Sequence, residues 1–192
     1  MIKLVFGFLL CASSAFASGD HDHGDHQEII SRSSLAQALV MAVEEYSSTP
    51  QASPILALES KSAEDGNEAL IYSPAGEQKI IATAYHCHAD YCHEEDQLGP
   101  VAYNYGTLAF DLEAFEESLA QTLDIFERKV SPLTSITEIK LWQVFDQIEV
   151  RYNYADNAGL TQSSYYMCHV HGSHFDCHRK RNPGIHEPII GE

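Results

Sequence analysis

Two stretches of the chain combine cysteine and histidine at spacings that suit paired β-strands. Residues 85–93 read YHCHADYCH, and residues 165–178 read YYMCHVHGSHFDCH. Imidazole nitrogens are ligands for zinc and copper, whereas cysteine pairs form disulfides in an oxidising compartment. The residue types therefore indicate metal binding, disulfide formation or both.

The second stretch is predicted to fold into a β-hairpin about Gly172 and Ser173, because glycine suits the first central position of a type II′ turn. This register places Cys168 opposite Cys177 on a non-hydrogen-bonded pair, where the two Cα atoms are close enough for a disulfide. Side chains alternate between faces along a strand, so the histidines fall on the face opposite the cysteines. That face carries Met167 and the candidate metal ligands His169, His171, His174, Asp176 and His178.

The first stretch gives the same arrangement when its turn is placed at Ala89 and Asp90. Cys87 then faces Cys92, and the histidines again share the opposite face. The candidate ligands on this hairpin are His86, His88 and His93. The prediction for both stretches is a disulfide on one side of a hairpin and a histidine cluster on the other.

A histidine face of this kind is typical of a zinc or copper site, and three histidines leave one coordination position open. Met167 is a soft ligand that favours copper. Each hairpin could hold a metal ion, or the two could share one if they packed face to face. The disulfides would fix the hairpin register, since a slip of one residue would turn the histidines to the other face.

Other interpretations of the Cys/His stretches stay open. The hairpins could be disulfide-stabilised tips whose solvated histidines contact a protein partner. Mixed Cys/His zinc ligation would need reduced thiols, which are unexpected after secretion. Covalent haem attachment uses the spacing C-x-x-C-H, whereas both stretches have longer spacings. The chain shows no nucleophile elbow, phosphate loop or HExxH motif, so a metal-dependent enzyme ranks behind a metal-binding protein.

The 192-residue chain begins with features of a secretory signal peptide over residues 1–17, with an apolar run followed by an A-x-A cleavage site. Cleavage would remove Cys11 and leave four cysteines, an even number that suits two disulfides. The net charge of −17 favours cations as partners and argues against nucleic acid and anionic membranes. We therefore expect a periplasmic or secreted protein that is not inserted in a membrane.

Composition and periodicity suggest how the rest of the chain is divided. Residues 18–32 are rich in His and Asp and read as a disordered arm that could catch metal loosely. A first unit is expected over 33–93, a linker with a possible short strand over 94–110, a second unit over 111–178, and an extended tail over 179–192. Within the units we expect helices at 34–47 and 111–129, and strands at 55–61, 68–72, 79–88, 101–105, 136–145, 148–154 and 160–171.

The two units show the same predicted order of elements, a helix followed by three strands and a Cys/His hairpin. The residues around the cysteines also recur, with Cys87-His88 matching Cys168-His169 and Cys92-His93 matching Cys177-His178. These observations predict an α+β protein built by tandem duplication. Each unit would contain one helix and a three- or four-stranded antiparallel sheet that ends in a disulfide-clipped Cys/His hairpin.

Overall fold

A computed structural model describes residues 23–50, 52–77, 79–102, 112–171 and 174–181. The helices are α1 (His23–Ser31), α2 (Ser34–Ser48) and α3 (Leu112–Lys129), followed by a short 3₁₀ turn, η1 (Leu133–Ser135). The strands are β1 (Ala57–Ala63), β2 (Gly66–Pro74), β3 (Lys79–Cys87), β4 (Cys92–Ala102), β5 (Ile136–Val144), β6 (Gln147–Ala155), β7 (Thr161–His171) and β8 (His174–Lys180).

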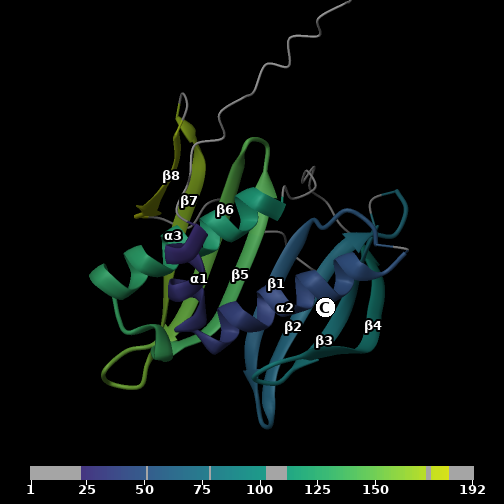
Figure 1. Cartoon of the computed structure of the whole chain (residues 1–192), viewed down its shortest axis with the longest axis horizontal. Coiled ribbons are helices and arrows are strands. Elements are labelled where there is room, and N and C mark those ends of the chain that lie inside the picture. Colours follow the sequence, from purple (N-terminus) through teal and green to yellow (C-terminus); the bar gives the residue numbers. More distant parts are fainter. Residues whose placement is uncertain (1–22, 51, 78, 103–111, 172–173, 182–192) are drawn as a thin grey trace, which may run out of the picture.

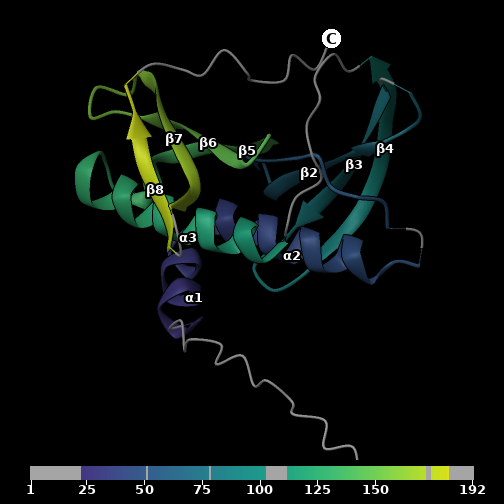
Figure 2. The same ribbon diagram turned by 90° about the horizontal axis from the view of Figure 1, so that it is seen from above.

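All eight strands belong to one antiparallel sheet with the order β4-β3-β2-β1-β5-β6-β7-β8. Consecutive strands pair through hairpins within residues 57–102 and again within residues 136–180. Helices α2 and α3 cover one face of this sheet, as the two views in Figures 1 and 2 show. The strand order leaves the first Cys/His hairpin, β3–β4, at one edge and the second, β7–β8, at the other.

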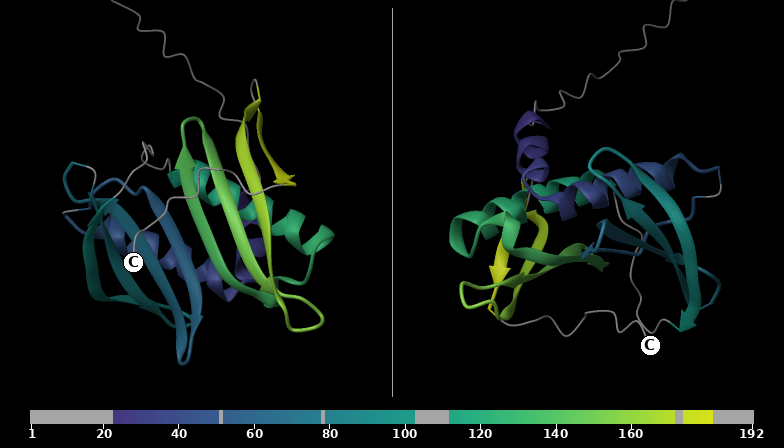
Figure 3. Two further views of the ribbon diagram at one scale, coloured as in Figure 1. Left: turned by 180° about the vertical axis from the view of Figure 1, so that it is seen from behind. Right: turned by 90° about the horizontal axis from the view of Figure 1, so that it is seen from below.

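The expected division into tandem duplicated units, each with its own sheet, is wrong. Strand β1 pairs with β5 in a regular antiparallel register in which Leu58 lies opposite Leu141 and Ser60 lies opposite Ile139. Strands β1 and β5 would otherwise be edge strands, and their pairing satisfies backbone groups that would remain open to association. The result is one continuous sheet over a common core. The left view in Figure 3 shows the strands from behind.

The main core lies between the sheet and the two long helices. Helix α2 contributes Leu35, Leu39 and Val43, and α3 contributes Phe115 and Phe126. These side chains pack on sheet residues from both halves of the chain, namely Leu58, Ile71, Tyr85, Ile139, Leu141, Val150, Tyr152 and Tyr166. The apolar stripes predicted for the two helices therefore face a single shared core.

A buried hydrogen bond joins α3 to the sheet. The hydroxyl oxygens of Thr122 in α3 and Tyr152 in β6 are 2.6 Å apart. Burial is the main cause of a strongly raised pKa for the Tyr152 hydroxyl, so this phenol stays protonated.

The opposite face of the sheet carries a smaller apolar cluster that includes Tyr72, Ile80 and Trp142. Ion pairs flank it, with Lys140 Nζ 3.6 Å from Glu59 Oε2 and Lys180 Nζ 2.6 Å from Glu149 Oε1. Lys140 and Glu149 are largely buried, so each ion pair provides an oppositely charged partner for a group that is removed from water.

Two local predictions also differ from the structure. Part of the arm expected to be disordered forms α1, because Ile30 is buried in the core and Arg32 Nη1 lies 3.1 Å from Glu127 Oε2 of α3. The segment expected as a linker continues as β4 to Ala102. Helix α2 begins at Ser34 as expected, and it is capped by Ser33, whose Oγ accepts from the amide of Ala36.

Other expectations fall outside the described residues. These are the signal peptide over 1–17, the arm up to residue 22, the linker from 103 onwards and the tail after residue 181. Within the described part of the chain, no helix combines the length and the apolar character that a bilayer crossing requires.

Candidate functional site

The first hairpin has the register expected from its cysteines. Cys87 pairs with Cys92 and His86 pairs with His93, while the amide of His88 donates to the carbonyl of Tyr91 at 2.9 Å. Cys87 and Cys92 form a disulfide with their Cα atoms 4.1 Å apart. Both sulfur atoms lie within 3.7 Å of the carbonyl oxygen of Ala38, so the disulfide packs against α2.

Three imidazole rings gather on the other face of this hairpin. The ring centroids of His86 and His88 are 4.6 Å apart, those of His86 and His93 are 5.5 Å apart, and those of His88 and His93 are 5.9 Å apart. We call His86, His88 and His93 the histidine cluster. The ring of Tyr91 packs on the ring of His88 with a centroid distance of 4.7 Å, which covers one side of the cluster.

The three histidines differ in their exposure to solvent. His86 is only 8 % exposed, His88 is half-buried and His93 is exposed. His86 is the member held most firmly, because the β1–β2 hairpin lies against it. A Cβ atom at Gly66 would lie 3.1 Å from His86 Nε2 and 2.7 Å from the carbonyl oxygen of Cys87, so this close approach requires glycine.

Carboxylates lie beside the cluster. Asp65 Oδ1 is 3.8 Å from His86 Nε2. Glu68 is the residue directly opposite His86 across β2 and β3, and its Oε2 lies 3.1 Å from Lys61 Nζ. Carboxylates that face a histidine orient its ring and increase its basicity toward a metal.

The second hairpin also has its expected register. Cys168 pairs with Cys177 in a disulfide, with Cα atoms 4.1 Å apart, and His169 lies opposite Asp176. Met167 pairs with His178, and His171 pairs with His174. The rings of His169 and His178 are in edge contact, with centroids 5.1 Å apart. His174 and Asp176 are exposed, and the side chain of His171 falls outside the described residues.

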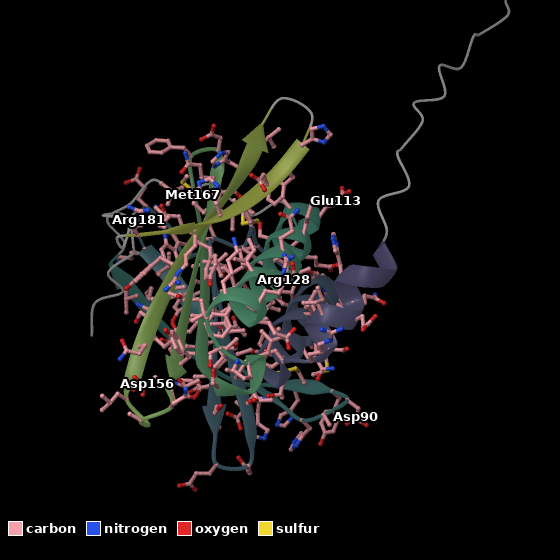
Figure 4. All side chains as sticks on the ribbon, turned by 90° about the vertical axis from the view of Figure 1, so that its left-hand side faces the viewer. Asp90, Glu113, Arg128, Asp156, Met167 and Arg181 are labelled. Atoms are coloured by element: carbon pink, nitrogen blue, oxygen red, sulfur yellow. A yellow bond between two sulfur atoms is a disulfide. The ribbon has the colours of Figure 1, made fainter. Side chains whose placement is uncertain are left out.

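The two hairpins do not face each other. They occupy opposite edges of the sheet. Figure 4 shows Asp90, at the tip of the first hairpin, and Met167, on the second, toward opposite ends of the molecule. One metal ion shared between both histidine sets is therefore incompatible with this fold, and a metal site would be confined to one hairpin.

The disulfides also limit the chemistry of the cysteines. Because the four cysteine sulfur atoms of the two hairpins are bonded in pairs, they offer neither thiolate ligands for zinc nor thiols for haem attachment. Among the described residues, no group of three or more His, Cys, Asp or Glu side chains already stands in an arrangement that would hold a metal ion. A metal at the histidine cluster would therefore require the rings to turn about their side-chain bonds.

Sequence reasoning missed Asp65 and Glu68 as neighbours of the cluster. The contact of these carboxylates with His86 depends on the register between β2 and β3. Tyr91 is the residue opposite His88 when the turn is placed at Ala89 and Asp90, so its contact with His88 follows from the predicted hairpin.

The paired cysteines are compatible with a secreted or periplasmic protein. Comparison of the chain with known protein families, with curated proteins and with solved structures found no match.

Proposed function

We propose that this protein binds zinc or copper at the histidine cluster of the first hairpin and acts in metal capture, buffering or delivery in the periplasm or outside the cell. The observation that carries the proposal is the mutual proximity of three imidazole rings, with centroid distances from 4.6 to 5.9 Å. Imidazoles bound tetrahedrally at about 2.1 Å have centroids roughly 5 Å apart. Rotation of the rings, without movement of the strands, would thus bring their nitrogens to one ion.

The surroundings of the cluster support the same proposal. The disulfide on the opposite face holds the two strands in the register that keeps His86 opposite His93. Asp65 provides an exposed carboxylate that could orient His86 or complete the coordination. The chain has a net charge of −17, which raises the local concentration of cations.

Three histidine ligands leave a coordination position for water or for a partner's ligand. Such an incomplete set suits capture and delivery, because an acceptor can take the metal through the open position. The second hairpin is the weaker candidate, since one close ring pair, His169 with His178, lies among its described side chains.

The test is a calorimetric titration of the metal-free protein with zinc and with copper. The background variant should carry His21→Gln, His23→Gln and His26→Gln, so that the histidines near the N-terminus do not contribute. We expect one tight site per chain. Adding His88→Gln and His93→Gln should lower its affinity at least about 100-fold, because loss of a mere outer-sphere partner already costs 10–100-fold.

A matched control is the pair His174→Gln and His178→Gln, which removes two exposed histidines from the second hairpin. This control should leave the affinity unchanged. His86 is left intact, because it is buried and its replacement could disturb the fold. If neither metal binds, or if only the control pair abolishes binding, the proposal for the first hairpin is wrong. Absence of binding by either metal would favour the alternative, a protein-interaction module with solvated histidines.

A further inference from the structure

A second candidate site lies on the helix-covered side of the sheet, away from the histidine cluster. A cavity of about 370 Å³ opens between the last turn of α2, the segment that follows it, and strands β2, β3 and β4. Figure 1 shows α2 crossing these strands on one face of the sheet. The volume falls within the range of pockets that take small organic molecules.

Tyr85 provides an unsatisfied polar group in the wall of this cavity. Its side chain is 1 % exposed, and its hydroxyl has no hydrogen-bond partner among the described residues. Tyr46, which also lines the cavity, differs in this respect, because its hydroxyl donates to the carbonyl of Ser53 and accepts from the amide of Ser53. Buried polar groups are normally paired, so the Tyr85 hydroxyl points to a missing partner.

The charges around the cavity select the kind of partner. Glu94 lies directly opposite Tyr85 across β3 and β4 and lines the cavity, while no lysine, arginine or histidine is among its described lining residues. Burial, followed by the charges of Glu94 and Glu45, raises the pKa of the Tyr85 hydroxyl to about 12. The electrostatic potential at the phenol is therefore negative. The C-terminal end of α2 makes this potential more negative, which favours the binding of cations.

The remaining walls combine hydroxyls with aromatic and aliphatic surface. Ser73 and Thr83 contribute short polar side chains, and Ile81 contributes an apolar one. The rings of Tyr46 and Tyr85 can also attract a cation through their faces. A carbon chain that ends in an ammonium group matches this mixture better than an anion or a neutral sugar does.

We propose that this cavity binds a small protonated amine, with the ammonium group donating to the Tyr85 hydroxyl oxygen and to the Glu94 carboxylate. The methylene groups of the amine would lie against Ile81 and the tyrosine rings. This site shares no residue with the histidine cluster, so the proposal does not depend on whether the cluster binds a metal.

The experiment is an NMR titration of the metal-free full chain with three probes of similar length: putrescine, 1,4-butanediol and succinate. Putrescine should cause saturable shifts centred on the amides of Ser53, Ser73 and Thr83, whereas the diol and the diacid should cause none. Glu94→Gln should weaken putrescine binding about tenfold or more, because it removes a charged hydrogen-bond partner. Tyr85→Phe should also weaken binding, and it leaves no unsatisfied hydroxyl, so the variant should fold.

The matched control is Glu95→Gln, which removes an exposed carboxylate next to Glu94 that is not among the lining residues. This variant should bind putrescine as the parent does. The proposal is overturned if the diol binds as well as putrescine, or if succinate binds. It is also overturned if putrescine causes no saturable shift, or if its shifts spread over the acidic surface and persist in Glu94→Gln.

Discussion

The pairing of β1 with β5 predicts that the two halves of the chain unfold together. Leu58 and Leu141 lie directly opposite each other at this junction, and both are fully buried in the main core. Replacing either leucine by alanine should lower the free energy of unfolding by about 3 kcal/mol, which combines lost burial with the cavity left behind. With a urea dependence of about 2 kcal/mol per molar, the midpoint should fall by about 1.5 M.

The assay is equilibrium unfolding in urea under oxidising conditions, followed by circular dichroism and by the fluorescence of Trp142. Parent and variants should each show a single transition at which both probes coincide. The double variant should lose less than the sum of the single losses, by about 0.5 kcal/mol or more, because the two side chains are cross-strand neighbours. Ser62→Ala, at an exposed position of β1, is the control and should change stability by less than about 0.5 kcal/mol.

Two separate transitions would refute this reasoning, above all if Leu141→Ala shifted one and left the other at the midpoint of the parent. That outcome would mean that the halves fold independently and that the β1–β5 contact contributes little. Losses below about 1 kcal/mol in both single variants would also contradict the burial of these leucines in a shared core.

Two further predictions concern the disulfides and the buried tyrosines. Paired Cys→Ala replacement should lower the free energy of unfolding by about 2 kcal/mol for Cys87–Cys92 and by about 3 kcal/mol for Cys168–Cys177, because the disulfides close loops with sequence separations of 5 and 9. Urea unfolding of the oxidised variants measures these losses, and losses near zero would contradict the loop-closure argument. The free energy of unfolding should fall as the pH rises above about 10, which is the ordinary tyrosine pKa. The reason is that burial raises the pKa of four tyrosines, so that they bind protons more tightly in the folded state: Tyr72, Tyr85, Tyr152 and Tyr166. The Tyr85 contribution is complete below pH 10 and is lost as the pH rises toward its pKa of about 12, so Tyr85→Phe should reduce the alkaline loss, and an unchanged pH profile would argue against its burial.

The amino-acid sequence by itself determined the structure of the two hairpins. Cys87 with Cys92, and Cys168 with Cys177, are joined by very short loops, so strand alternation and turn position are enough to pair them and to place the histidines on the opposite face. Helices α2 and α3 could also be predicted from the sequence, because the amphipathic pattern of a helix depends only on residues that are close together in the chain.

The tertiary structure alone decided how these local pieces combine. No periodicity specifies that β1 pairs with β5, since this contact joins residues about 80 positions apart and depends on the fit of whole layers. The same holds for the approach of Asp65 and Gly66 to His86, and for the cavity beside Tyr85. Pairing across long loops is set by the packing of the complete core, and for this reason one sheet formed where the repeated local pattern suggested two.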